Sequence, residues 1–236
     1  MPPLLLALAP LALAAAGVTA DADRLLARHQ DEEAFALVSQ AAAAGDADAI
    51  VYLARFYEEG IHVEPDRARA AKLYAQAADR GDAEAKWRLG MLLDSSEVVT
   101  PATARAIRLF RAAAAGGEAR AFVSLGVMYS IGRGVSQDHV EALRNYEAGA
   151  RLGYAHAFNE IGIVHLAGEG VPEDPVEATA WFLVAMLMGD PSGAENLGEM
   201  FALLGESDVR QASQRANEIA RDYGVAAKPG KDVLPG

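Results

Sequence analysis

Histidine and carboxylate side chains could do chemistry in this sequence, but their spacing fits no catalytic or metal-binding motif. None of the five histidines stands in the His-Glu-x-x-His spacing that places two zinc ligands on one helix face. Glu160 and His165 are five residues apart, which puts them on different faces of a helix. No Gly-x-Ser-x-Gly or Ser-x-x-Lys motif occurs, and cysteine is absent. We therefore predict no enzyme activity, no catalytic residue, no metal site and no cofactor.

Composition narrows the classes of partner. The 236 residues carry a formal net charge of −12. Nucleic-acid-binding domains present basic patches to phosphates, so this charge argues against DNA or RNA, and it equally disfavours an anionic membrane surface. The chain is 52% hydrophobic but only 7% aromatic, and much of its apolar fraction is alanine. Small residues suit closely packed helices, and the length is sufficient for one well-buried domain.

The first twenty residues have the composition of an export signal. The sequence MPPLLLALAPLALAAAGVTA contains no charged side chain, and its apolar run Leu4–Ala16 is short for a bilayer span. Small residues at Val18–Ala20 fit a peptidase site before Asp21. We predict a signal peptide over 1–20, cleaved after Ala20, and a periplasmic or secreted protein with no membrane span after cleavage. An uncleaved N-terminal anchor is the alternative.

The elements that would position any functional side chain follow a 36-residue period. Glycine recurs at this step, and so do an alanine, a leucine or isoleucine, a small residue and an aromatic residue. These columns are Gly45, Gly81, Gly117, Gly153 and Gly189; Ala49, Ala85, Ala121 and Ala157; Leu53, Leu89, Leu125, Ile161 and Leu197; Ala54, Gly90, Gly126, Gly162 and Gly198; and Tyr74, Phe110, Tyr146 and Phe182. A fixed period of this length indicates stacked supersecondary units.

Each unit is predicted to hold two helices joined by a turn. Apolar residues recur at helical spacing before and after the turns GIHVEPD, GRGVSQD and GEGVPED. An aspartate ends each turn and suits a helix N-cap, and Asp138 with Glu141 has the spacing of a capping box. We expect neighbouring helices to touch closely at the column of small residues that includes Gly126. A lone pair cannot bury its apolar face, so the copies must stack.

The pattern Ala-x-x-x-Leu-Gly-x-x-Tyr, Gly-x-Gly-Val, Asp and Ala-x-x-x-Tyr at this period resembles the Sel-1-like repeat, a relative of the tetratricopeptide repeat. The resemblance covers about Gly45–Gly205 and implies an all-α fold, an α/α solenoid with a right-handed superhelix of about five 36-residue helix-turn-helix repeats. We expect a signal peptide (1–20), a degenerate half-repeat (21–44), four repeats (45–80, 81–116, 117–152 and 153–188), a partial repeat with a capping helix (189–223) and a disordered tail (224–236).

Related helix-pair repeats bind extended peptides on a concave face lined by their first helices. By this analogy, the inward positions form an apolar strip flanked by arginines, with an asparagine able to reach a peptide backbone. The predicted partner-binding residues are Val51, Arg55, Trp87, Met91, Arg120, Val123, Val127, Asn159 and Ile163. The same residues could instead pack neighbouring helices, and the sequence does not decide between a groove and packing.

The resemblance implies an exported, non-catalytic scaffold that binds a partner protein or an extended peptide of unknown identity. A cysteine-rich branch of the family is associated with β-lactam binding and hydrolysis, which makes a cell-wall or β-lactam ligand protein the alternative. The absence of cysteine here departs from that branch. An exported effector that contacts a host would share the binding mechanism of the scaffold.

Overall fold

A computed structural model describes residues 17–94 and 100–225, and these form twelve α-helices and no strand. The all-α solenoid expected from the repeats is confirmed. The described chain divides into two compact units, one ending at Ala85 and one beginning at Lys86. The predicted signal peptide up to residue 16, the stretch 95–99 and the predicted tail from 226 lie outside the described residues.

The first unit contains α1 (Val18–Leu26), α2 (Asp31–Ala43), α3 (Ala47–Glu59) and α4 (Arg67–Asp79). Helix α3 contacts α1, α2 and α4, which explains why eight of its 13 residues are buried. Two helices, α1 and α2, therefore precede α3 in the described part of this unit, around the segment 21–44 where a half-repeat was expected. The expected cleavage after Ala20 falls inside α1, in which Val18 and Ala22 are buried.

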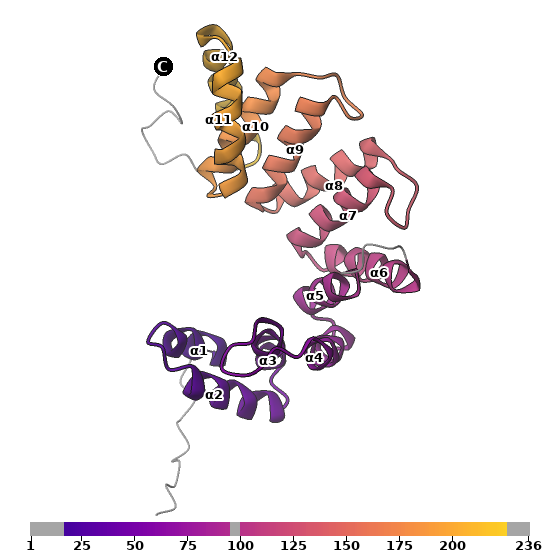
Figure 1. Cartoon of the computed structure of the whole chain (residues 1–236), viewed down its shortest axis with the longest axis vertical. Coiled ribbons are helices and arrows are strands. Elements are labelled where there is room, and N and C mark those ends of the chain that lie inside the picture. The colour runs from indigo at the N-terminus through magenta and orange to yellow at the C-terminus, as the bar shows by residue number, and fades with distance from the viewer. Residues whose placement is uncertain (1–16, 95–99, 226–236) are drawn as a thin grey trace, which may run out of the picture. The chain divides into compact units, whose positions relative to one another are not determined.

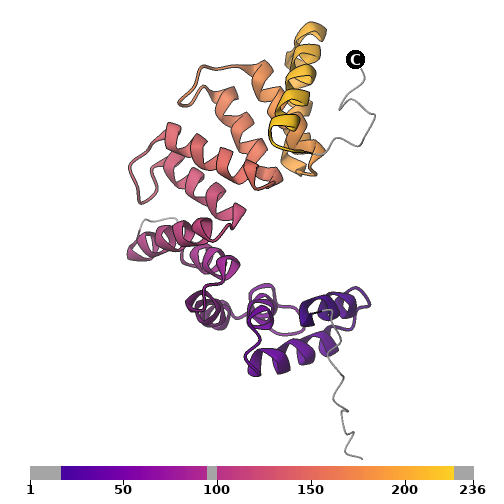
Figure 2. The same cartoon turned by 180° about the vertical axis from the view of Figure 1, so that it is seen from behind.

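The second unit is a stack of helix pairs (Figures 1 and 2). Its helices are α5 (Ala83–Leu93, from Lys86 onward), α6 (Pro101–Ala115), α7 (Ala119–Ile131), α8 (His139–Arg151), α9 (Ala155–Ala167), α10 (Pro175–Leu187), α11 (Pro191–Leu203) and α12 (Glu206–Asp222). Helix α10 contacts α9, α11 and α12, and residues 178–185 of α10 are all buried. The core of this unit is centred there.

The repeat-boundary glycines and the turn aspartates end and begin the helices as expected. All five boundary glycines, from Gly45 to Gly189, have φ between 80° and 103°, a region that side-chain-bearing residues rarely adopt. Asp138 accepts a hydrogen bond from the Glu141 backbone N–H at 2.9 Å, but the Asp138 N–H donates to the Tyr129 carbonyl. The expected reciprocal capping box is therefore only half formed at this turn. A complete one occurs at Thr100.

At three positions, the column of small residues marks a close approach of neighbouring helices, as expected. A Cβ at Gly126 would lie 2.4 Å from Cε1 of Tyr146, and Gly90 and Gly162 face Phe110 and Phe182 in the same way. Each glycine thus accommodates the aromatic ring of its own pair's second helix. The close approach at these positions is between the two helices of one repeat.

The turns contribute contacts between successive repeats of the second unit. A Cβ at Gly134 would meet Thr103 and Ile107 on the preceding α6, and Val135 packs against the core cluster that includes α6. Arg133 in the same turn donates from Nε to both carboxylate oxygens of Asp94, at 2.9 and 3.1 Å. The turn between α7 and α8 is therefore anchored on the repeat that precedes it.

Candidate functional site

Two of the predicted binding residues, Val51 and Arg55, lie on α3 in the first unit. Val51 is 7% exposed, so it offers little surface to a partner. The Arg55 guanidinium lies over the Tyr52 ring, with its carbon 5.0 Å from the ring centroid, and its Nε is 3.5 Å from Glu59. These contacts give Arg55 a packing role on its own helix.

Val51 and Arg55 line a pocket of about 260 Å³ together with Thr19, Asp48, Tyr52, Asp82 and Glu84. The lining is mainly polar and carries three carboxyl groups. The Tyr52 hydroxyl donates to Asp23, and burial together with that carboxylate raises the pKa of Tyr52 to about 12. Tyr52 is therefore neutral at physiological pH. The sequence analysis expected Arg55 to flank an apolar strip, and in the structure Arg55 lines this small polar hollow.

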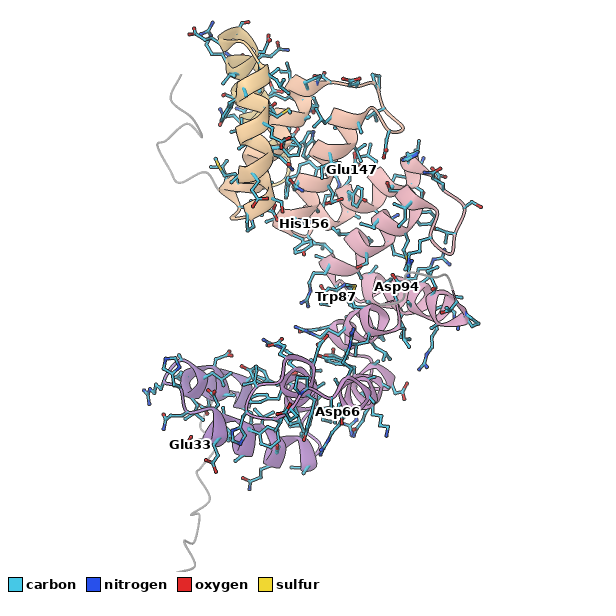
Figure 3. All side chains as sticks on the ribbon, viewed as in Figure 1. Glu33, Asp66, Trp87, Asp94, Glu147 and His156 are labelled. Atoms are coloured by element: carbon cyan, nitrogen blue, oxygen red, sulfur yellow. The ribbon has the colours of Figure 1, made fainter. Side chains whose placement is uncertain are left out.

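In the second unit, the first helices of successive pairs form a row, because α7 contacts α9 and α9 contacts α11. Trp87 on α5 and His156 on α9 lie along this side of the unit (Figure 3). Met91, Val127 and Ile163 occupy equivalent positions on α5, α7 and α9, and they are 46%, 39% and 41% exposed. We call these three residues the apolar stripe, and the side that carries them the first-helix face.

Trp87 and Arg120 connect α5 to α7. The Arg120 guanidinium lies 4.0 Å above the Trp87 ring centroid, and its Nε and Nη2 each donate to a Glu118 carboxylate oxygen at 2.7 Å. Burial tends to raise the pKa of Glu118, but the hydrogen bonds from Arg120 outweigh burial and lower it. Glu118 therefore stays ionised and holds Arg120 over the indole.

Ser124 completes this contact between the two helices. The Trp87 indole N–H donates to the Ser124 hydroxyl at 3.1 Å, and that hydroxyl lies 3.8 Å from the Met91 sulfur. Trp87 is half-buried as a result. Some of the predicted residues thus pack helices and others do not. Trp87 and Arg120 pack helices together, while Met91 remains open to solvent.

Val123 and Asn159 are also buried, at 7% and 2% exposure. The Asn159 side-chain oxygen accepts a hydrogen bond from the Asn196 amide at 2.7 Å. It therefore joins α9 to α11 and is not open to a peptide backbone. Of the nine predicted binding residues, only Met91, Val127 and Ile163 are exposed on this face, each by 39% to 46%.

His156 lies between two carboxylates on the same side. Its Nε2 is 3.2 Å from Glu160 and its Nδ1 is 3.1 Å from Asp190, whose other oxygen caps α11 through the Gly193 N–H at 2.9 Å. The contact with Glu160 raises the pKa of His156 against the opposing effect of burial, and Asp190 adds to the rise. Sequence motifs did not reveal this cluster, because Asp190 is 34 residues away from His156 in the chain.

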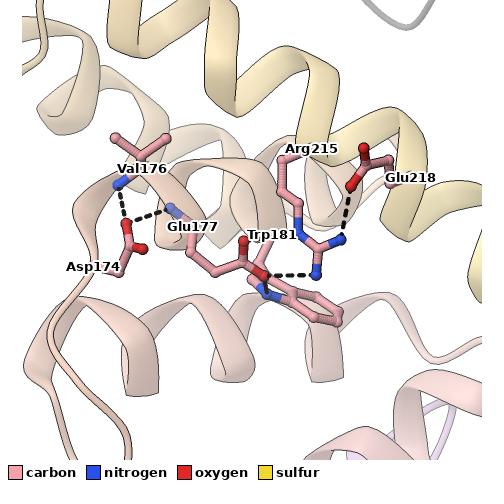
Figure 4. Close-up of polar contacts among 6 residues, drawn as sticks. All are labelled: Asp174, Val176, Glu177, Trp181, Arg215 and Glu218. Carbon is pink, nitrogen blue, oxygen red and sulfur yellow. Dashed lines mark hydrogen bonds and ion pairs between the residues drawn. The ribbon is translucent and has the colours of Figure 1, made fainter.

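A second polar cluster closes the C-terminal end of the unit (Figure 4). Arg215 on α12 donates to both oxygens of Glu177 on α10, at 2.8 and 3.2 Å, and its Nη1 donates to Glu218 at 2.9 Å. The Trp181 indole donates to Glu177 at 2.9 Å. These hydrogen bonds raise the pKa of Arg215. The cluster fastens α12 to α10 beside a pocket of about 200 Å³.

Two of the remaining histidines, His139 and His165, pack or pair within the fold. His165 stacks on Trp181 with the ring planes 9° apart, and burial lowers the pKa of His165. His139 is half-buried, with its Nδ1 3.1 Å from Glu169. Within residues 17–94 and 100–225, no group of three or more His, Asp or Glu side chains is placed to hold a metal ion.

The helices of the described ranges are each too short or too polar to cross a membrane. Stacked helix-turn-helix pairs define the protein as an α/α solenoid. The chain belongs to the Sel1 repeat family, whose model matches residues 26–46, 47–82, 83–118, 121–154 and 155–190. Sel1 repeats generally mediate protein interactions. No curated protein sequence matches the chain.

Solved structures share the fold. A protective antigen of uropathogenic Escherichia coli with an SLR fold is 28% identical, with a TM-score of 0.72, over 84% of this chain and 44% of that one. A Sel1 repeat protein from Oxalobacter formigenes is also 28% identical, with a TM-score of 0.70, over 87% of this chain and 86% of the other. An immunity protein from Pseudomonas aeruginosa, 21% identical with a TM-score of 0.58 over 87% and 83%, shares the fold alone.

Proposed function

We propose that this protein is a non-catalytic binding protein that is exported from the cytoplasm and holds an extended segment of a partner protein or peptide on its first-helix face. One observation carries the proposal: Met91, Val127 and Ile163 stand at equivalent positions on three consecutive first helices and are 39% to 46% exposed. Apolar side chains aligned across helices suit a bound segment, because each can bury apolar area against it.

The surroundings of the stripe support a preformed surface. Arg120 and Trp87 fix α5 against α7, and Asn159 with Asn196 fixes α9 against α11. A rigid surface loses little conformational entropy when a ligand binds, which favours affinity. The signal-peptide-like composition of residues 1–20 supports a location outside the cytoplasm. Cell fractionation with and without residues 1–20 would test that location.

The experiment that tests binding compares two valines of similar exposure. Val127 is 39% exposed on the first-helix face, and Val140 is 46% exposed on α8. Peptides selected from a random display library on the full chain should bind Val127→Glu at least about tenfold more weakly, because a buried valine contact is lost and a carboxylate is desolvated. Val140→Glu should bind as the wild type does. Equal binding by wild type and Val127→Glu would contradict the proposal.

A further inference from the structure

On the next first helix, α11, two carboxylates follow the apolar stripe. Glu199 stands 36 residues after Ile163, so it occupies the equivalent position on the next first helix, and Glu195 lies one helical turn before it. Both side chains are exposed. Helix α11 contains no lysine, arginine or histidine, and neither carboxylate has an ion-pair or hydrogen-bond partner among the described residues.

The hydrogen bond between Asn159 and Asn196 sets the register of this end of the face. Asn159 is one helical turn from Ile163, and Asn196 lies next to Glu195 and about one turn from Glu199. The 2.7 Å bond between the two amides therefore holds the end of the apolar stripe beside the two carboxylates. The face changes from apolar to negative between α9 and α11.

Other charges along the row are already paired. Arg120 is held by Glu118, and His156 lies between Glu160 and Asp190. The charge of the whole chain, −12, adds a long-range attraction for cationic ligands. The uncompensated charge that a ligand would meet on α11 is therefore negative.

We infer that the first-helix face takes an extended segment whose apolar side chains lie on Met91, Val127 and Ile163 and whose lysine or arginine side chains reach Glu195 and Glu199. This inference rests on the proposed function. Ammonium and guanidinium groups are the natural partners of such carboxylates, whereas an acidic segment would be repelled.

Helix spacing predicts the spacing of the ligand's side chains. Packed helices lie about 8–10 Å apart, and a polyproline II segment returns to the same face every three residues with a rise of about 3.1 Å per residue. One step along the segment's face thus matches one helix of the row. The expected pattern is an apolar residue at every third position, followed at the next such position by lysine or arginine.

Synthetic peptides and the full chain test this inference. The probe is a proline-containing peptide with leucine at every third position and lysines after the last leucine, made in both chain directions. Its counterpart carries glutamates in place of the lysines. Binding is measured by fluorescence anisotropy, with Glu195→Gln/Glu199→Gln as the test variant. The control is Glu173→Gln/Glu206→Gln, which neutralises two exposed glutamates outside α11.

We expect one direction of the lysine peptide to bind, and the test variant to weaken its binding about three- to tenfold at low salt, as two exposed charge pairs would. The control variant should bind as the wild type does. If the glutamate peptide binds equally well, or if the test variant has no effect, the inference is overturned. Sensitivity to Val127→Glu would then still support the proposed function. If neither peptide binds the wild type, both proposals fail.

Discussion

Replacing Gly126 by alanine should destabilise the protein through one aromatic ring. The new Cβ would lie 2.4, 2.6 and 2.9 Å from three carbons of the Tyr146 ring. Tyr146 is 2% exposed and packs in the core cluster of the second unit, so the ring has little room to move aside. We expect Gly126→Ala to be less stable than the wild type, although alanine is the better helix former.

The magnitude follows from two opposing effects. Overpacking a buried site costs about 1–3 kcal/mol, and contacts this short place the cost near the upper value. Replacing a helical glycine by alanine stabilises the helix by about 1 kcal/mol. The net loss at Gly126 is therefore about 2 kcal/mol. Gly198 belongs to the same column but has no atom within 4 Å of its Cβ position, so Gly198→Ala should gain about 1 kcal/mol.

Urea unfolding followed by circular dichroism measures both variants. A double-mutant cycle with Tyr146→Leu isolates the contact, because Gly126→Ala should cost much less once the ring is gone. The reasoning is refuted if Gly126→Ala is as stable as Gly198→Ala. It is equally refuted if the cost of Gly126→Ala is the same with and without the tyrosine ring.

Two further predictions concern the polar clusters. Arg215→Met should increase proteolysis of α12 and lower the free energy of unfolding by about 1 kcal/mol. The effect is limited because the arginine is 39% exposed and its ion pair with Glu177 is partly screened. Arg210→Met is the control and should change little, since Arg210 is 3.8 Å from its carboxylate partner at the surface. The raised pKa of His156 means that its stabilising effect is complete below about pH 6.5 and is lost as the pH rises through that raised value. His156→Gln should therefore lower the free energy of unfolding at acidic pH and have little effect at alkaline pH, and a constant difference across a pH series would contradict this.

Periodicity predicted the fold because its signals are local or repeated. Boundary glycines such as Gly117 need a positive φ, and turn aspartates such as Asp174 cap the next helix through hydrogen bonds to nearby N–H groups. Both requirements can be read from a few neighbouring residues. The same columns could not show what the small residue at Gly126 faces, because that depends on how the two helices of a pair are rotated.

The binding face was predicted only in part for a related reason. Residues on the same side of one helix do not share an environment: Val127 is exposed, whereas Val123, one turn earlier, is buried by neighbouring helices. Trp87 contacts Arg120 and Ser124, which lie about 33 and 37 positions further along the chain. The hydrogen bond from Asn196 to Asn159 also joins residues 37 positions apart, and no short motif encodes such pairs.

The backward anchoring of the turns gives the chain a direction of assembly. In the second unit, the turn after α7 rests on α6 and reaches Asp94, and the turn after α9, at Gly170, rests on the start of α8. A chain that emerges from a ribosome or a translocation channel with its N-terminus first would present each of these surfaces before the turn that needs it. Each new repeat could then dock as it appears, without waiting for the segment that follows.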